Sequence, residues 1–222
     1  MTENEPARPP EGVGLAGLRS AAAGCRACEL WEPATQTVFG EGPETARIVF
    51  VGEQPGDQED RVGEPFVGPA GKMLDRALGD AGIDRRDAYV TNAVKHFRFA
   101  PKGKRRIHQT PGPEHLRACR PWLEAEFTVL KPEIVVCLGA TAAKALISPS
   151  FRITKDRGRL LPWTPPGDEA LDPADEDEDA PSQTWMLATT HPSAILRTPD
   201  EGRAAAYDAL VADLTVVAHA LA

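Results

Sequence analysis

The sequence contains no run of about 18 apolar residues, which is the length that a membrane-spanning helix requires. Its first residues, MTENEPARPPEG, also lack the basic n-region and the apolar h-region of a secretion signal. We therefore expect neither a membrane segment nor export, and we expect the protein to work in the cytoplasm.

Cysteine is scarce, with only four residues in a chain of 222. A chain of this length buries a sizeable core without covalent help, so its fold does not need a disulfide framework. In the reducing cytosol, the pair Cys25-x-x-Cys28 favours metal or redox chemistry over a structural disulfide.

The formal net charge of −8 argues at first against a nucleic-acid partner, because DNA-binding proteins usually carry a basic footprint. The acidity is local, however. Residues 168–179 hold 8 of the 33 acidic residues, which leaves 25 acidic against 25 basic residues elsewhere. Between Lys95 and Pro113 there is no acidic residue but there are six cations: Lys95, Arg98, Lys102, Lys104, Arg105 and Arg106. This stretch predicts a phosphate-binding patch, with an ordinary solvated basic loop as the alternative.

Short apolar runs at 48–51, 89–90, 134–138 and 185–189 predict buried strands. Helical patterns precede, separate and follow these strands, at about 14–23, 69–81, 113–130, 140–147 and 201–221. The alternation predicts a three-layer α/β fold, with a central four-stranded parallel sheet and helices on both faces. We expect residues 13–222 to form a single domain, residues 1–12 to be disordered, and an acidic loop to lie at about 164–183.

A polar motif follows each predicted strand, and because parallel strands end at one edge of a sheet, the four motifs should share a pocket. They are GEQPGDQED at 52–60, TNAVKHF at 91–97, GATAAKAL at 139–146 and THPSAILR at 190–197. Glu53 and Asp57 put carboxylates there. Phe66, in EPFVGPAG, is a candidate stacking wall for a planar base, or else a core phenylalanine.

Several motifs together resemble, in order and spacing, the uracil-DNA glycosylase superfamily, and most closely its iron-sulfur family 4 and the related family X. The resemblance covers roughly residues 20–215. It rests on VGEQPGDQED, EPFVGPAG, YVTNAVK, Cys119 ahead of PWL, LGATAAKAL and HPSAILR. The stretch KRRIH at 104–108, in a longer loop than family 4 has there, looks like the insert that marks family X.

The resemblance implies a role for each matched residue. Asn92 would hydrogen-bond the pyrimidine edge and select uracil over cytosine, since an amide both donates and accepts. Phe66 would stack on the flipped base, and His191 would stabilise negative charge on the departing uracil. Glu53 and Asp57 would orient a nucleophile or stabilise the cationic sugar. Further contacts are implied for Gln54, with the base or the histidine, and for a DNA-backbone set of Lys104, Arg105, Arg106, Ser193 and Arg197.

His108 has a special role by the same resemblance. Cleavage of the glycosidic bond leaves oxocarbenium character at C1′, which a nearby nucleophile can capture. Attack by neutral imidazole, with its second proton passing to a base such as Glu53, gives an N-alkyl imidazole that has no good leaving group. The expected outcome is a single-turnover reaction that cross-links protein and DNA. The alternative is a histidine that only contacts phosphate.

For the metal site, the resemblance implies a 4Fe-4S cluster held by Cys25, Cys28, Cys119 and a fourth ligand. Cys137 lies inside the apolar run IVVCL, where a cysteine behaves as a small hydrophobe. His96 follows TNAVK, where family 4 carries a cysteine, so we favour His96 over Cys137. Zinc is the alternative metal, because Cys-x-x-Cys pairs also bind it. His115, at the start of the helix at 113–130, is expected at the surface.

These expectations add up to a monomeric uracil-DNA glycosylase that prefers uracil in single-stranded DNA and becomes covalently linked to the abasic site. The first rival is a family 4 type enzyme in which water attacks and the enzyme turns over. The second rival is a non-enzymatic iron-sulfur protein for nucleic-acid binding or electron transfer, since a Cys-x-x-Cys pair fits any cluster protein equally well.

Overall fold

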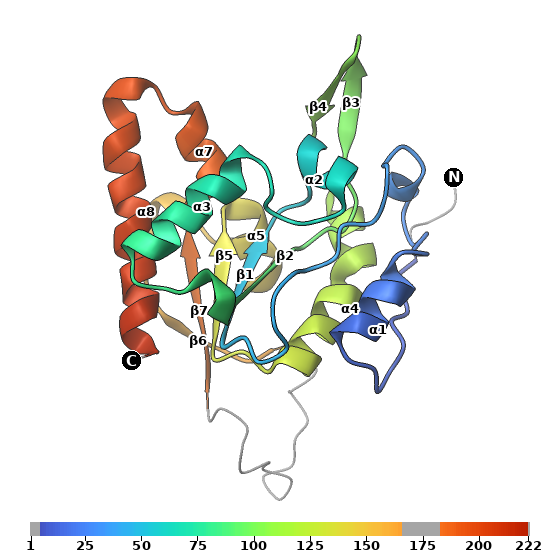
Figure 1. Ribbon diagram of the computed structural model, residues 1–222, viewed down its shortest axis with the longest axis horizontal. Helices are drawn as coiled ribbons and strands as arrows, with labels where there is room; N and C mark the ends of the chain where they lie inside the picture. The colour runs from blue at the N-terminus through green and yellow to red at the C-terminus, as the bar shows by residue number, and fades with distance from the viewer. Residues whose placement is uncertain (1–4, 166–182, 222) are drawn as a thin grey trace, which may run out of the picture.

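A five-stranded sheet crosses the middle of the protein in the order β2-β1-β5-β7-β6 (Figure 1). The computed structural model describes residues 5–165 and 183–221. The first four strands run parallel and β6 pairs antiparallel with β7 at the edge. The strands are β1 (Ile48–Gly52), β2 (Ala88–Asn92), β5 (Ile134–Leu138), β6 (Leu161–Trp163) and β7 (Thr184–Thr189). The predicted parallel sheet of four strands is confirmed, and β6 extends it by one.

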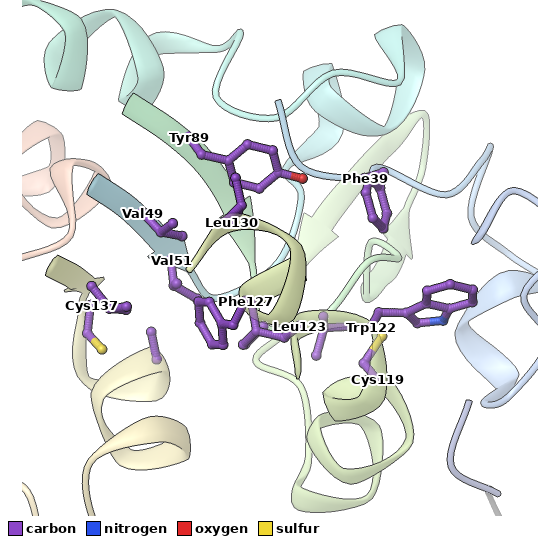
Figure 2. Packing of buried hydrophobic residues seen from close by; sticks show 14 of the residues in the cluster. Phe39, Val49, Val51, Tyr89, Cys119, Trp122, Leu123, Phe127, Leu130 and Cys137 are labelled. Carbon is purple, nitrogen blue, oxygen red and sulfur yellow. The ribbon is translucent and has the colours of Figure 1, made fainter. Parts of the chain in front are cut away.

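Each central strand is apolar on both faces, as a sheet covered on both sides requires. Alternate residues enter different cores: Val49 and Val51 face one side of the sheet, and Ile48 and Phe50 face the other. Figure 2 shows the first of these cores, where Val49, Val51 and Tyr89 meet aromatic and aliphatic side chains of the long helix α4.

Helices cover both faces of the sheet (Figure 1). One face packs against α1 (Leu15–Ala22), α4 (Pro113–Leu130) and α5 (Ala140–Leu146). The other packs against α3 (Pro69–Asp80), α7 (Pro192–Arg197) and α8 (Asp200–Ala220). The five predicted helices are confirmed, and α7 is additional, as are the short α2 (Asp57–Val62) and α6 (Ile153–Asp156) and the 3-10 turns η1 (Glu29–Trp31) and η2 (Arg85–Asp87).

A β-hairpin stands out from the body of the protein where we expected a loop (Figure 1). Strand β3 (Phe99–Lys102) pairs antiparallel with β4 (Arg105–His108), so that Phe99 lies opposite His108. Gly103, with φ of 60°, takes the left-handed conformation that the tight turn requires. His108 is therefore the last residue of a strand, in a defined register.

Two other expectations concern segments that the structure describes only in part. Ala7 is buried, and its N–H donates to the carbonyl oxygen of Ala118, 2.9 Å away. Ala7 is thus held against α4, and the expected disorder of residues 1–12 stays a prediction. Most of the acidic loop expected at 164–183 lies outside the described residues. Within residues 5–165 and 183–221, no helix has the length and apolar character needed to cross a bilayer.

A fully buried ion pair links the loop after strand β2 to helix α4. Lys95 and Glu126 are both 0% exposed, and Lys95 Nζ lies 2.5 Å from Glu126 Oε2. The ammonium also donates to Thr91 Oγ1 and to the carbonyl oxygen of Asn92. The carboxylate accepts from the hydroxyls of Tyr89 and Thr91 and from the N–H of Gly40. Lys95, which we expected in the basic surface patch, is part of the core instead.

The buried pair predicts a large cost for removing one partner alone. Lys95→Met leaves the Glu126 carboxylate buried without its cation, and we expect the free energy of unfolding to fall by about 3–5 kcal/mol. Urea denaturation followed by circular dichroism measures the effect. Lys95→Met combined with Glu126→Gln removes both charges and should recover much of the loss. A double variant no more stable than the single one would contradict this explanation.

Candidate functional site

A cavity of about 630 Å³ opens at the carboxyl ends of the parallel strands. The loops that follow β1, β2, β5 and β7 all contribute to its wall, as their positions in the sequence predicted. Of the residues expected in the base site, Glu53, Gln54, Phe66, Asn92, His108 and His191 line it, together with Ser193 and Arg197 from the expected DNA-backbone set.

Phe66 and Asn92 form one side of the cavity, and a glycine permits their arrangement. Asn92 ends β2 directly opposite Gly52 at the end of β1, and it is 3% exposed. A Cβ atom on Gly52 would lie 2.3 Å from Asn92 Oδ1 and 2.8 Å from Phe66 Cζ, so no larger residue fits. The Phe66 ring is near-parallel to that of His191, with centroids 6.1 Å apart. A planar ligand in the cavity could therefore stack on the ring of Phe66 and hydrogen-bond the amide of Asn92.

His191 is fixed as a neutral hydrogen-bond donor. It is the N-cap of α7, where its Nδ1 accepts the N–H of Ser193 at 3.1 Å. The ring proton therefore sits on Nε2, because Nδ1 is the acceptor. Burial, and to a lesser extent the nearby Arg197 and His108, together lower the pKa of His191 to about 4. A neutral N–H donor in the cavity wall can stabilise an oxyanion without carrying a formal charge.

His108 and Glu53 meet at the cavity, as proposed from the sequence. His108 Nε2 lies 3.4 Å from Glu53 Oε1, and the His108 side chain is 49% exposed against 19% for Glu53. The hydroxyl of Thr141 donates to the other oxygen of Glu53, which fixes the carboxylate. Burial lowers the pKa of His108, Glu53 raises it, and Arg197 lowers it again. With the net shift downward, the imidazole is neutral near pH 7 and has a free lone pair.

Arg106 anchors the hairpin that carries His108 and is not free for a DNA phosphate. Its guanidinium pairs with Asp57 and with the fully buried Asp60, and its side chain is only 15% exposed. It also lies over the rings of Phe97 and Phe99. We expected Arg106 to contact the DNA backbone. In the structure its guanidinium instead anchors the hairpin through Asp57 and Asp60.

Asp57 also has a different place from the one we expected. Burial raises its pKa, but hydrogen bonds from Arg61 and Arg106 outweigh that effect and hold the pKa below its usual value. Its carboxylate faces these two cations and does not line the cavity. Asp57 thus holds the hairpin, and Glu53 is the carboxylate that faces His108.

Gln54 lines the cavity, but its amide is already used. Its Nε2 donates to the carbonyl oxygens of Arg98 and Gln109, and its Oε1 accepts the N–H of Arg98. Both ends of the hairpin are thereby joined to the loop after β1. The side chain thus clamps the hairpin backbone, and the expected contact with base or histidine stays a prediction. Lys104 and Arg105 remain exposed on the hairpin, in keeping with their expected position.

Glu59 was missed by the sequence analysis, although it lines the cavity. Its two carboxylate oxygens accept the N–H groups of Gly56 and Gly68, at 3.1 and 2.8 Å. It thereby joins the start of α2 to the end of the loop that carries Phe66. The spacing of Gly56 and Glu59 at the start of α2 is that of a capping box, which was the available signal.

Two of the proposed metal ligands, Cys25 and Cys28, line a second, surface cavity of about 970 Å³, whereas Cys119 and His96 do not line it. Cys25 Sγ accepts the Trp122 indole N–H at 3.2 Å. Cys119 Sγ accepts the backbone N–H of Lys95, the residue before His96. Burial raises the pKa of the Cys28 thiol to about 11 and that of Cys119 to about 12. Within the described residues, no three His, Cys, Asp or Glu side chains are placed to share a single metal ion.

His96 has a nitrogen without a partner. Thr37 gives its hydroxyl proton to the carbonyl oxygen of Ala22 at 3.0 Å, so it can only accept from His96 Nε2, which is 2.9 Å away. The lone pair of the ring is then on Nδ1, which is buried and has no hydrogen-bond partner among the described residues. Burial lowers the pKa of His96 to about 4, so the ring stays neutral. A neutral imidazole with an orphaned lone pair is what a metal-binding histidine requires.

Cys137 lies in the core, away from this group. It is 0% exposed on β5, and its thiol contacts the sulfur of Met186 at 3.6 Å. Figure 2 shows it on the opposite side of the apolar core from Cys119 and Trp122. His115, which we expected at the surface, is 1% exposed, and its Nε2 lies 2.7 Å from the Glu29 carboxylate. That contact ties the chain directly after Cys28 to the start of α4.

Comparisons with known proteins find relatives over most of the chain. Residues 39–215 match the model of the uracil DNA glycosylase superfamily. A type-4 uracil-DNA glycosylase of Thermotoga maritima is 43% identical over 140 residues, which are 63% of this chain and 69% of the relative. One of Sulfurisphaera tokodaii is 34% identical over 181 residues, covering 79% of this chain and 73% of the relative. A type-5 uracil-DNA glycosylase of Thermus thermophilus is 36% identical over 127 residues, covering 50% and 54%.

The neutral state of His191 predicts part of the acid sensitivity of the fold. The unfolded histidine takes up a proton near its ordinary pKa of 6.5, but the folded one does so only near 4. The free energy of unfolding therefore falls as pH drops through this window, by at most about 1.4 kcal/mol per pH unit from this residue. His191→Asn keeps an acceptor for the N-cap but cannot titrate. Urea midpoints at pH 7 and pH 5 should differ less for this variant than for the wild type.

The matched control for this measurement is His219→Asn, because His219 is exposed on α8. Its pH dependence should follow that of the wild type. Equal acid sensitivity of His191→Asn and the wild type would show that His191 is charged in the folded protein.

Proposed function

Because the chain belongs to the uracil DNA glycosylase superfamily, we propose that it excises uracil from DNA. The observation that carries the proposal is the cavity in which Asn92, Phe66 and His191 converge at the carboxyl ends of the strands. The relatives named above as type-4 uracil-DNA glycosylases support it. Its substrate is uracil in DNA, with single strands preferred because an unpaired base enters a cavity without the cost of unpairing. It acts as a monomer.

The residues of the cavity suit the chemistry of base loss. The amide of Asn92 reads the edge of the pyrimidine, and the ring of Phe66 stacks on its face. As the glycosidic bond breaks, its electron pair moves onto the uracil ring. The Nε2–H of His191 donates to the oxygen that gains this charge, which lowers the barrier to departure.

We propose that His108 captures the sugar cation. One imidazole nitrogen forms a bond to C1′ with its lone pair, and the proton on the other nitrogen leaves for Glu53 or for solvent. Uracil departs with the former glycosidic pair and takes up a proton. The product is a neutral N-alkyl imidazole, which leaves protein and DNA joined. The support is the position of His108 beside Glu53, the net lowering of the pKa of His108, and the way Arg106 and Gln54 fix the hairpin.

The second candidate function is a turnover glycosylase in which water attacks C1′. It is favoured by the names of the relatives, which are type-4 enzymes with 33–43% identity to this chain. In that case Glu53 would orient the water, and His108 would contact the DNA.

A denaturing gel distinguishes the two. Incubation with a single-stranded oligonucleotide that contains one uracil should give a protein-DNA band that survives heat and detergent, with at most one uracil released per protein. His108→Ser should abolish the band, whereas His219→Ser, at an exposed position on α8, should keep it. No stable band, together with many uracils released per protein, would establish the water mechanism and refute the covalent one.

We propose further that Cys25, Cys28, His96 and Cys119 hold a 4Fe-4S cluster. In such a cluster each ligand binds a different iron atom, so the four side chains need not surround one ion. The orphaned Nδ1 of His96 and the two cysteines beside the surface cavity fit this ligand set. When bound, the cluster supplies a cross-link between the segment of Cys25 and the loops of His96 and Cys119. Glu29 and Thr37 hold two of these segments in place from outside the ligand set.

The cluster proposal predicts a brown protein with broad absorbance near about 400 nm and about four irons per chain. His96→Ala should lower the iron and sulfide content, because the lone pair on Nδ1 is lost, and His96→Cys should restore it. Cys137→Ala is the matched control and should leave the iron content unchanged. A colourless protein that contains zinc, or one that loses its iron with Cys137→Ala, would overturn the assignment.

A further inference from the structure

A second basic segment lies beside the cavity, outside the base site and the hairpin. It surrounds the short helix α6 (Ile153–Asp156) and contains Arg152, Lys155, Arg157 and Arg159. The acidic residue among them is Asp156, whose carboxylate accepts the backbone N–H of Arg152. Four of the five charged residues in the segment 152–159 are therefore cations.

Three of these cations are free to meet a ligand. Arg157 is already engaged, because it pairs with Asp213 and donates to the hydroxyl of Thr190. The side chains of Arg152, Lys155 and Arg159 are exposed. Among residues 5–165 and 183–221, no acidic side chain forms an ion pair with any of the three. We call these three residues the α6 strip.

The α6 strip lies on the side of the cavity away from the hairpin. Ile153, between Arg152 and Lys155 in sequence, lines the cavity, and Arg157 holds the loop that contains His191. The hairpin leaves the sheet at β2, and α6 packs against β7. Because the strand order is β2-β1-β5-β7, the mouth of the cavity lies between them. The exposed hairpin cations Lys102, Lys104 and Arg105 are thus matched by three cations across the mouth.

We propose that the α6 strip binds backbone phosphates of the DNA strand on one side of the flipped nucleotide, while the hairpin binds those on the other side. The inference rests on the proposed function, since it names where the substrate strand leaves the cavity. A strand that crosses the mouth of the cavity from the hairpin to α6 meets both basic surfaces. The distribution also explains how a chain with a net charge of −8 can hold a polyanion, because cations at the mouth act over about 8 Å at physiological salt.

The salt dependence of DNA binding measures how many phosphate contacts the α6 strip makes. The probe is a fluorescent single-stranded oligonucleotide without uracil, so that binding is read apart from excision. Each phosphate contact contributes about 0.7 to the slope of log K against log salt for single strands. Arg152→Gln, Lys155→Gln and Arg159→Gln together should therefore lower the slope by about 2.

The matched control removes three exposed cations from the opposite end of the sheet, where the strands begin. Arg47→Gln, Arg86→Gln and Lys131→Gln change the net charge by the same amount. The control variant should keep the wild-type slope to within about 0.5. If the strip and control variants lose slope equally, the cations act only through net charge and the proposal is wrong.

Neutral methylphosphonate links, placed one at a time on either side of a single uracil, test which side of the flipped nucleotide the α6 strip binds. In the wild type, links on both sides should weaken binding. In the strip variant, links on one side should have no further effect, and those on the hairpin side should still weaken binding. A strip variant that stays equally sensitive to links on both sides would overturn the inference, even if uracil is excised. A wild type that releases no uracil would refute the proposed function and leave these binding results standing.

Discussion

The buried pair of Lys95 and Glu126 is the contact on which both halves of the site depend. The ammonium pairs with the Glu126 carboxylate and donates to the carbonyl oxygen of Asn92, whose side chain lines the cavity. The backbone N–H of the same lysine donates to Cys119 Sγ. Taking two charges out of water costs several kcal/mol each, and the cost is offset only if all their hydrogen-bonding groups find partners. Tyr89, Thr91 and Gly40 supply those partners. The geometry at the end of β2 is therefore tightly determined.

A second group of charges fixes the hairpin, and it explains why the stretch rich in lysine and arginine is not uniformly a DNA surface. Arg106 points back to Asp57 and Asp60, and Arg98 donates to the carbonyl oxygen of Thr110 at the base of the hairpin. Only the cations near the turn stay exposed. A side chain that must reach C1′ needs a rigid support, since a nucleophile held in position has a much smaller entropic barrier than a mobile one. The inner cations supply this support.

The sequence predicted the parallel strands, the five longer helices and the convergence of four loops, because periodicity and strand order depend on local pattern. It missed β3, β4 and β6, which are three or four residues long, and two of them contain proline. It also did not show the internal partners of Asp57, Arg106 and Gln54, whose polar groups turn to residues 44–55 positions away in the chain. Residue type shows that a side chain is able to bind DNA or a base. It does not show whether a closer internal partner already occupies it.

The position of His108 at the end of a strand, and not in a loop, affects how it could compete with water. A loop histidine would sample many positions, and water at about 55 M in bulk solution would compete for the cation at C1′. In the structure His108 is instead the last residue of β4, paired with Phe99 and close to the ring of Phe97. Glu53, which would receive a proton or orient a water, is itself held by Thr141. If His108 attacks C1′ as proposed, its competition with water depends on how rigidly the hairpin holds the imidazole at the cavity. The two proposed mechanisms differ less in their catalytic groups than in the rigidity of one hairpin.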